Sequence, residues 1–269
     1  MSICFDSRLL LIYWAVIFQG DYMKMMDAIT NKKDGAPADE VEKVCKSVNS
    51  RVVTILDYDY PKRLKRSCFR PPIVLFYHGD LSLLDDDKHL LGVVGSRKYS
   101  EYGKEATNKV VGEIARDVVT VSGLAYGIDS IAHRASINSG GRTVAVLGSG
   151  INNCYPKENQ DLYEEIKKNH LVISEYPDMT VPAPEHFPIR NRIVAALSDA
   201  VLVPQINTYQ SGTNITINLA LEMHKEVFAI PHPIGEEEPT VTNALINEGA
   251  TLVENGKDII ESMKWGEKK

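Results

Sequence analysis

Small and polar residues follow several short apolar runs of this sequence. Gly95-Ser96-Arg97 comes directly after one such run, and Ser122-Gly123 closes a second. Gly148-Ser149-Gly150 follows a third run, and Ser211-Gly212-Thr213 comes after a fourth. Glycine lets backbone N–H groups approach an anion closely, and the N-terminus of a following helix adds a favourable partial charge. These loops therefore predict a site for a phosphate or another anion, with the first loop supplying a guanidinium as counter-charge.

The stretch HFPIRNRIVAALS holds a second group of such residues, Phe187, Arg190, Asn191 and Arg192. Its apolar spacing predicts a helix over 191–198, so the two arginines lie in or near the first turn. Positive charge there opposes the helix dipole, and a bound polyanion would account for it. Phe187 is either a buried contact that fixes the helix start or an exposed platform for a base. The residues alone favour the buried contact.

Patterns for catalysis are weaker. Asp129 and His133 are four residues apart on a predicted helix over 128–138. The pair could orient a general base, but an ion pair along the helix face or a hydrogen bond at the helix N-terminus is the favoured interpretation. The sequence has no G-x-S-x-G, Walker, H-E-x-x-H or E-x-x-H pattern. Because GSGINN does not complete G-x-G-x-x-G, a dinucleotide-dependent dehydrogenase is disfavoured, and we expect no cofactor.

The elements that must position these residues are short strands alternating with helices. Apolar β-branched runs begin near residues 92, 118, 143, 171, 200, 226 and 250. Because these runs lack polar alternation, we expect strands that are buried on both faces. Helices predicted over 102–116, 128–138, 159–168, 191–198 and 215–224 separate most of them, which is typical of βαβ units. We therefore predict an α/β, Rossmann-like doubly wound fold with a mostly parallel sheet, whose loops meet at the carboxyl ends of the strands.

Residues 1–55 are predicted to form a small helical appendage, and residues 56–269 the Rossmann-like domain. Helical spacing before and after a turn near Gly20-Asp21, with a helix over 41–48, supports this division. The apolar run Leu9–Phe18 is too short to span a bilayer. A signal-peptide core would have this length, but mixed charge precedes the run and no small-residue cleavage site follows it. A buried helix is therefore favoured, and we expect no membrane partner.

Charge and cysteine content restrict the class of protein further. The net charge is −6, so binding of nucleic acid would need a local basic patch. The basic run PKRLKRSCFRPP, residues 61–72, is interpreted as a solvated face. The four cysteines, Cys4, Cys45, Cys68 and Cys154, are scattered and form no C-x-x-C. A zinc site, or any other metal site, and a disulfide framework are therefore disfavoured, and a reducing, cytoplasmic location is expected.

Several motifs occur together in one order: VVGSRKYSEYGKEA, VSGLAYGIDSIAHRASINSGGRTVAVLGSGINNCYP, FPIRNRIVAALSDAVLV, SGTNIT and NALINEGATLV. In this order the sequence resembles the DNA-processing protein A family, also called Smf, from about Asp57 to about Val253. The resemblance implies an extended Rossmann-like domain that binds single-stranded DNA without sequence specificity and forms a homodimer. It also implies a role in loading the RecA recombinase during natural transformation, with displacement of single-strand-binding protein and no catalytic activity.

The resemblance further implies one nucleic-acid-binding surface made of the glycine-rich loops and the start of a helix. Its residues in this sequence are Gly95, Ser96, Arg97, Ser122, Gly123, Phe187, Arg190, Asn191, Arg192, Ser211, Gly212 and Thr213. The first three are the implied phosphate contacts. For Phe187, the resemblance changes the preferred role from a buried contact to stacking on a base.

Some positions depart from the family pattern. Pro204-Gln205 stands where the family often has Glu-Ala, Thr216-Ile217 replaces a Thr-Ala pair, and His232 replaces a glycine. The rim near these residues is expected to differ. The N-terminal helices resemble a reduced form of the family's sterile-alpha-motif-like domain. Because only sixteen residues follow Val253, we expect no C-terminal winged helix.

Two rival functions remain open. Phosphoribohydrolases that cleave nucleoside monophosphates have a similar fold and the motif P-G-G-x-G-T-x-x-E. Gly212-Thr213 matches part of that motif, but Thr216 stands where the catalytic glutamate would be. Without that carboxylate the hydrolysis lacks its acid–base group. A nucleotide-sensing module is the other alternative, and nothing in the sequence excludes it.

Overall fold

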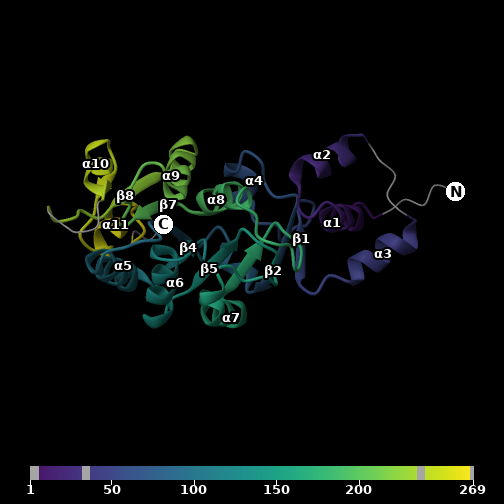
Figure 1. Ribbon diagram of the computed structural model, residues 1–269, viewed down its shortest axis with the longest axis horizontal. Helices are drawn as coiled ribbons and strands as arrows, with labels where there is room; N and C mark the ends of the chain where they lie inside the picture. Colours follow the sequence, from purple (N-terminus) through teal and green to yellow (C-terminus); the bar gives the residue numbers. More distant parts are fainter. Residues whose placement is uncertain (1–5, 32–36, 235–239, 267–269) are drawn as a thin grey trace.

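The computed structural model describes residues 6–31, 37–234 and 240–266 of the chain. Its centre is a sheet of nine described strands in the order β1-β2-β6-β5-β4-β3-β7-β8-β9 (Figure 1). From β3, the strands β4, β5 and β6 follow on one side, and β7, β8 and β9 follow on the other. The direction of winding therefore reverses between β3 and β7, which makes this the topological switch point of the sheet.

The seven predicted strands are confirmed, and they pair in parallel with one another. Every residue of β4, β5, β6 and β7 is buried, which is why these runs lack polar alternation. Their bounds are β3 (His89–Val93), β4 (Val118–Ser122), β5 (Thr143–Leu147), β6 (Leu171–Ser174), β7 (Ala200–Val203), β8 (Glu226–Ala229) and β9 (Thr251–Leu252).

Two strands that the sequence pattern did not predict extend the sheet. β1 (Arg51–Thr54) and β2 (Val74–Gly79) add to it beyond β6, and both pair antiparallel with their neighbours. β2 ends at Gly79, where φ is +98° and an added Cβ would lie 1.9 Å from the carbonyl oxygen of His170. Only glycine fits this crossing, so the antiparallel extension depends on it.

Helices cover both faces of the sheet, as a doubly wound fold requires. One face carries α5 (Glu101–Ile114), α6 (Ile128–Asn138), α7 (Gln160–Asn169) and α11 (Gly256–Ser262). The other carries α4 (Lys62–Ser67), α8 (His186–Leu197), α9 (Gly212–Glu222) and α10 (Thr242–Asn247) (Figure 1). Short 3₁₀ turns are η1 (Leu81–Leu84) and η2 (Lys157–Asn159). In β3 the neighbours Leu90 and Leu91 pack into clusters on opposite faces, as the period of a strand dictates.

Two helices near the predicted site begin earlier than their apolar spacing indicated. α8 begins at His186 rather than at 191, and α9 at Gly212 rather than at 215. Pro188 lies in the first turn of α8, where a missing N–H costs nothing. Arg190 and Arg192 consequently lie in the second turn, which agrees with the expectation that they lie in or near the first turn.

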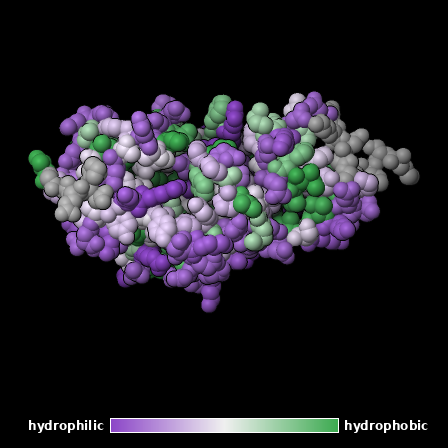
Figure 2. Space-filling view, viewed as in Figure 1, coloured by the Kyte–Doolittle hydropathy of each residue, from purple (hydrophilic) through white to green (hydrophobic). Residues whose placement is uncertain are grey.

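The N-terminal segment forms α1 (Ser7–Ile17), α2 (Tyr22–Thr30) and α3 (Ala38–Lys46) at one end of the long axis (Figure 1). The expected turn before Asp21 is present, with positive φ at Gln19 and Gly20. Four residues of α1 are buried, as expected for a core helix. Within the described ranges, no helix has the length and apolar character needed to cross a membrane. Figure 2 shows hydrophobic side chains gathered over this end of the molecule.

Candidate nucleic-acid interface

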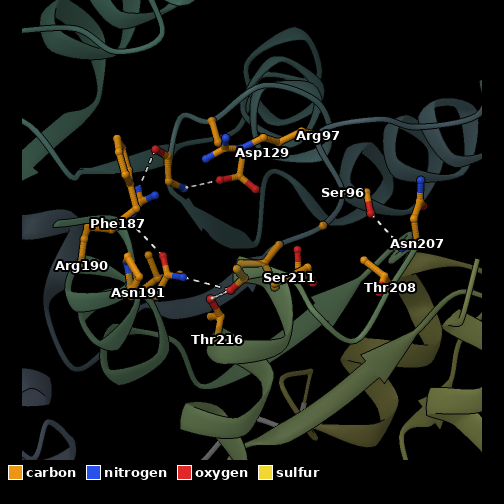
Figure 3. A pocket seen from close by; sticks show the side chains of 18 of the residues that line it. Ser96, Arg97, Asp129, Phe187, Arg190, Asn191, Asn207, Thr208, Ser211 and Thr216 are labelled. Carbon is orange, nitrogen blue, oxygen red and sulfur yellow. Dashed lines mark hydrogen bonds between the residues drawn. The ribbon is translucent and has the colours of Figure 1, made fainter. Parts of the chain in front are cut away.

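A pocket of about 490 Å³ opens at the topological switch point, beyond the carboxyl ends of β3 and β7. The loops after β3, β4 and β7 line it, together with residues of α6, α8 and α9 (Figure 3). Ten of the twelve residues predicted for the nucleic-acid-binding surface meet there. They are Gly95, Ser96, Arg97, Gly123, Phe187, Arg190, Asn191, Ser211, Gly212 and Thr213.

The loop after β3 is held by backbone contacts on two sides. The Ser96 N–H donates to the carbonyl of Gln205 over 2.9 Å, and the Ser96 Oγ accepts from the N–H of Asn207, also over 2.9 Å. The carbonyl of Ser96 accepts from the N–H of Ile128. Gly95 fits because an added Cβ would lie 2.7 Å from the Ile128 side chain. The Ser96 hydroxyl proton remains free to donate to a ligand, since a hydroxyl both donates and accepts.

Arg97 follows this fixed loop and is exposed. Its side chain has no ion pair or hydrogen bond with any residue in the part of the chain that the structure describes. Lys98 lines the same part of the pocket and is also exposed. We call Arg97, Lys98 and Phe187 the pocket mouth. Its two cations carry charge that no described carboxylate neutralises by direct contact.

The second arginine of the pocket is buried, with 5% of its surface exposed. The Arg190 Nη1 donates to the carbonyl of Gly123 over 2.6 Å and also to the carbonyl of Val146. Asp129, likewise buried, accepts from the N–H of Gly123 over 3.1 Å. An added Cβ on Gly123 would lie 2.2 Å from the Arg190 Nη1, so this glycine makes room for the guanidinium. We call Arg190, Asp129 and Gly123 the pocket floor.

Charges at the pocket floor influence one another. Burial raises the pKa of Asp129, and the nearby Arg190 guanidinium acts in the opposite direction. Burial lowers the pKa of Arg190, Asp129 opposes that shift, and the like charge of Arg97 adds to it. Arg97, Lys98 and Arg190 are the basic residues that line the pocket, against the single carboxyl group of Asp129. An anion that enters the pocket would therefore meet an excess of positive charge.

The start of α9 supplies donors for such an anion. The Ser211 Oγ caps the helix by accepting from the N–H of Asn214. The N–H groups of Gly212 and Thr213 have no hydrogen bond with a described residue, as is usual in a first helical turn. Nothing lies within 4 Å of a Cβ added to Gly212, so its backbone is open to the pocket. Asn191 donates to the carbonyl of Gly212 over 3.1 Å and so joins α8 to this loop.

Phe187 lies in the first turn of α8, partly exposed, at the edge of the pocket (Figure 3). Its ring packs over Gly148, where an added Cβ would come within 2.8 Å of it. Tyr155 lies beside it with ring centroids 5.5 Å apart and planes tilted by 39°. A hollow of about 50 Å³ adjoins these rings, Tyr126 and Arg97. The residue-based prediction that Phe187 forms a buried contact ahead of the helix is therefore wrong, because Phe187 belongs to the helix and is partly exposed.

Two predicted contact residues do not line the pocket. Ser122 is completely buried, and its Oγ donates to the carbonyl of Val93 over 2.6 Å. Arg192 points away along α8, where its Nη2 forms an ion pair with Glu175 over 2.7 Å. Both side chains are bonded within the protein and neither lines the pocket, so the structure does not bring Ser122 and Arg192 together with the other ten residues.

The glycine-rich loop after β5 also lies outside the pocket lining. Ser149 is 1% exposed. The Gly150 N–H donates to the carbonyl of Thr180 over 2.9 Å, and an added Cβ would lie 2.1 Å from the carbonyl oxygen of Asp178. Three of the four predicted loops therefore converge. The small residues of the fourth permit close packing against another loop.

Lys98, Asn207, Thr208 and Asp129 line the pocket without having been predicted as contact residues. The first three could have been found from their position directly after β3 and β7, since every loop at the switch point faces the pocket. For Asp129, the sequence pattern indicated only a possible pair with His133 and not a position in the pocket lining.

No catalytic pair forms between Asp129 and His133. The His133 ring is fully buried, its Nδ1 lies 2.6 Å from the Thr143 Oγ1, and burial lowers its pKa to about 3. Asp129 instead bonds the N–H of Gly123. Neither the general-base arrangement nor a helix-face ion pair is present among the described residues. The other favoured interpretation, a hydrogen bond at the helix N-terminus, is confirmed, because Asp129 in the first turn of α6 accepts from the Gly123 N–H.

A βαβ sheet with helices on both faces and a cation-rich, amide-lined pocket at its switch point defines a Rossmann-like, doubly wound protein. Within this class, the chain belongs to the family described as DNA recombination-mediator protein A, whose model matches residues 51–264. It is 41% identical to the DNA processing protein DprA of Bacillus subtilis over 212 residues, which covers 78% of this chain and 70% of the relative. Identity to the Streptococcus pneumoniae DprA is 42%, covering 79% and 74% of the two chains.

Solved structures agree with this assignment. The X-ray structure of DprA from Streptococcus pneumoniae superposes with a TM-score of 0.76 and 34% identity, covering 95% of this chain and 93% of that one. DNA processing protein A from Helicobacter pylori gives a TM-score of 0.72 and 30% identity, covering 82% of this chain and 99% of that one. The study of the Helicobacter pylori protein concerns its single-stranded DNA binding mode.

Residues that depart from the family pattern form supports behind the pocket. The buried Gln205 accepts from the N–H of Ser100 over 2.9 Å and donates to the Asn207 Oδ1 over 3.0 Å. His232 Nε2 donates to the carbonyl of Pro204 over 2.9 Å. Gln205 therefore connects the loops after β3 and β7, which places Asn207 against the pocket.

Proposed function

We propose that this protein binds single-stranded DNA at the pocket without preference for sequence. The observation that carries the proposal is the unpaired, exposed Arg97 beside the open N–H groups of Gly212 and Thr213. Guanidinium and amide groups recognise phosphate oxygens, and such contacts carry no sequence information. Phe187 adds a partly exposed ring at the same rim, on which any base can stack. Membership of the recombination-mediator family supports this assignment.

Binding rather than catalysis is the proposed role of the pocket. Asp129 is the carboxyl group that lines it, and this side chain is occupied by the Gly123 N–H and faces the Arg190 charge. Thr216 lines the pocket where a phosphoribohydrolase would have its glutamate, and its hydroxyl donates to the carbonyl of Gly212. A general acid or base needs a carboxyl that can exchange its proton with the substrate. Incubation with AMP is expected to release no free base, and release of adenine would contradict this part of the proposal.

The binding test compares a labelled oligo-dT with a duplex of equal length by fluorescence anisotropy. Arg97→Glu is expected to weaken binding to the single strand at least about tenfold, because it replaces a phosphate contact by a repulsion. Arg116→Glu is the matched control. Arg116 is exposed and comes just before β4, so it lies at the amino end of that strand, whereas the pocket lies at the carboxyl ends of the strands.

Circular dichroism spectra of both variants must match that of the wild type. Equal affinity of Arg97→Glu and wild type for the single strand would refute the proposed site. Tighter binding of the wild type to duplex than to the single strand would refute the proposed ligand. Affinity must also fall steeply with added salt, because bound phosphates release counterions.

The proposed cellular role is to assist loading of the RecA recombinase onto single-stranded DNA during natural transformation and recombination, with the protein acting as a homodimer. Two copies of a short site would hold one strand more firmly, because the second contact becomes intramolecular. The protein is expected to shorten the lag of RecA ATP hydrolysis on DNA coated with single-strand-binding protein, and Arg97→Glu to restore that lag. An unchanged lag with wild-type protein would contradict the role in loading the recombinase. A monomeric mass by light scattering at working concentration would contradict the homodimer.

A further inference from the structure

The basic run over 61–72 is only partly a solvated face. Arg63 is largely buried and forms an ion pair with Asp199, and Arg66 forms an ion pair with Asp86. The interpretation of a solvated face is therefore wrong for Arg63. Three further cations of the run, Lys62, Lys65 and Arg70, are exposed and have no ion pair with a described carboxylate.

Next to one of these cations stands an exposed aromatic ring. Phe69 is 88% exposed, and the Arg70 guanidinium carbon lies 5.6 Å from the centroid of its ring. Backbone contacts fix the segment on both sides: the Cys68 N–H donates to the carbonyl of Leu64, and the Tyr60 hydroxyl donates to the carbonyl of Pro72 over 2.6 Å. The ring therefore projects from a held loop, although nothing in the core requires it there.

The same loop is tied to the helix that forms one side of the pocket. Arg192 donates from Nε to the carbonyl of Arg70 and from Nη1 to the carbonyl of Ile189, each over 2.9 Å. One guanidinium thus joins the Phe69–Arg70 loop to the first turn of α8. That turn also contains Pro188, which lines the pocket, and Ile189, which is 44% exposed. An exposed surface therefore leads from the pocket across this turn to Phe69.

We propose that single-stranded DNA leaving the pocket crosses the first turn of α8 and stacks a base on Phe69, while Arg70 contacts an adjacent phosphate. This proposal rests on the proposed function of the pocket. A basic groove with interleaved aromatic rings is the usual surface for single strands, since every base has a face that can stack. An acidic protein segment would use only the positive charges of this surface. The exposed Phe69 ring favours nucleic acid over such a partner, because a base can stack on it.

The experiment compares two labelled oligo-dT probes on the full chain by anisotropy, one of about 6 and one of about 20 nucleotides, within the range of single-strand sites. Phe69→Ala is expected to weaken binding to the long probe at least about fivefold, and to leave the short probe, which fills only the pocket, within about twofold of wild type. Phe69→Trp keeps a ring and should bind both probes as wild type does. The matched control is Tyr58→Ala, which removes a 95% exposed ring just before α4 and should change neither affinity.

Each failure has a distinct signature. Wild-type affinity of Phe69→Ala for the long probe would overturn the inference, as would an equal loss on both probes, which indicates damage to the pocket. Weakening by Arg70→Glu without weakening by Phe69→Ala would assign the surface to charge alone and overturn the stacking. Failure of the proposed function itself would appear as wild-type protein that binds neither probe.

Discussion

Two arginines line one pocket and differ in what their charge can do. Arg97 at the pocket mouth is exposed and has no ion pair with a described residue. Arg190 at the pocket floor is buried and donates to the carbonyls of Gly123 and Val146. The mouth can exchange water for a ligand, whereas the floor fixes the ends of β4 and β5. The comparison teaches that proximity to a pocket does not by itself make a charge available for binding.

The largest expected effect follows from removing the buried charge. Arg190→Met leaves the carbonyls of Gly123 and Val146 without a donor and Asp129 without its nearby cation. We expect the free energy of unfolding in urea to fall by about 3–5 kcal/mol, as when one partner of a buried ion pair is removed. Arg97→Met, the matched control, should stay within about 0.5 kcal/mol of wild type, because its side chain is exposed.

If both variants lose the same stability, the mouth and the floor do not differ in the way proposed. If Arg190→Met keeps the stability of wild type and loses only DNA affinity, Arg190 acts chiefly on the ligand. Either result would break the comparison.

A smaller effect concerns the interior behind the pocket floor. The Thr143 hydroxyl donates to the carbonyl of Thr120, so the His133 Nδ1 must carry the proton that it donates to the Thr143 Oγ1. The His133 Nε2 is buried without a partner, and burial lowers the pKa of the ring to about 3. Protonation of Nε2 would place a positive charge in the interior, where no described group accepts a hydrogen bond from this nitrogen. The unfolded chain, with a histidine pKa of about 6.5, therefore binds more protons than the folded chain between pH 6.5 and 3.

Stability should accordingly fall as pH drops through this window, with a slope from His133 of up to about 1.4 kcal/mol per pH unit. His78 and His170, whose pKa values burial also lowers, add slopes of the same sign. His133→Gln removes one titrating group. Urea unfolding at several pH values between 6.5 and 4.5 should therefore show a shallower decline for this variant. Parallel curves for variant and wild type would mean that His133 is protonated in the folded protein.

The sequence was sufficient for much of the architecture. Apolar runs without polar alternation located all seven parallel strands. Burial on both faces removes the polar positions of β4, β5, β6 and β7, whereas the short outer strand β9 is not fully buried. It was not sufficient for β1 and β2, whose antiparallel pairing depends on a crossing at Gly79 between segments far apart in the chain. The start of α8 was also misplaced. A proline is compatible both with the segment ahead of a helix and with its first turn, where no hydrogen bond is lost, so Pro188 does not mark where α8 begins.

For the site, the sequence by itself determined that small residues and arginines would gather at one edge of the sheet, because the carboxyl ends of parallel strands share that edge. Only the tertiary structure decided which of them are open to a ligand. Ser122, Arg190 and Arg192 carry the same polar groups as Ser96 and Arg97, yet their bonds run to Val93, to Val146 and to Glu175. Those partners lie on other segments of the chain, and the availability of a charge depends on burial and partners, which local spacing does not encode.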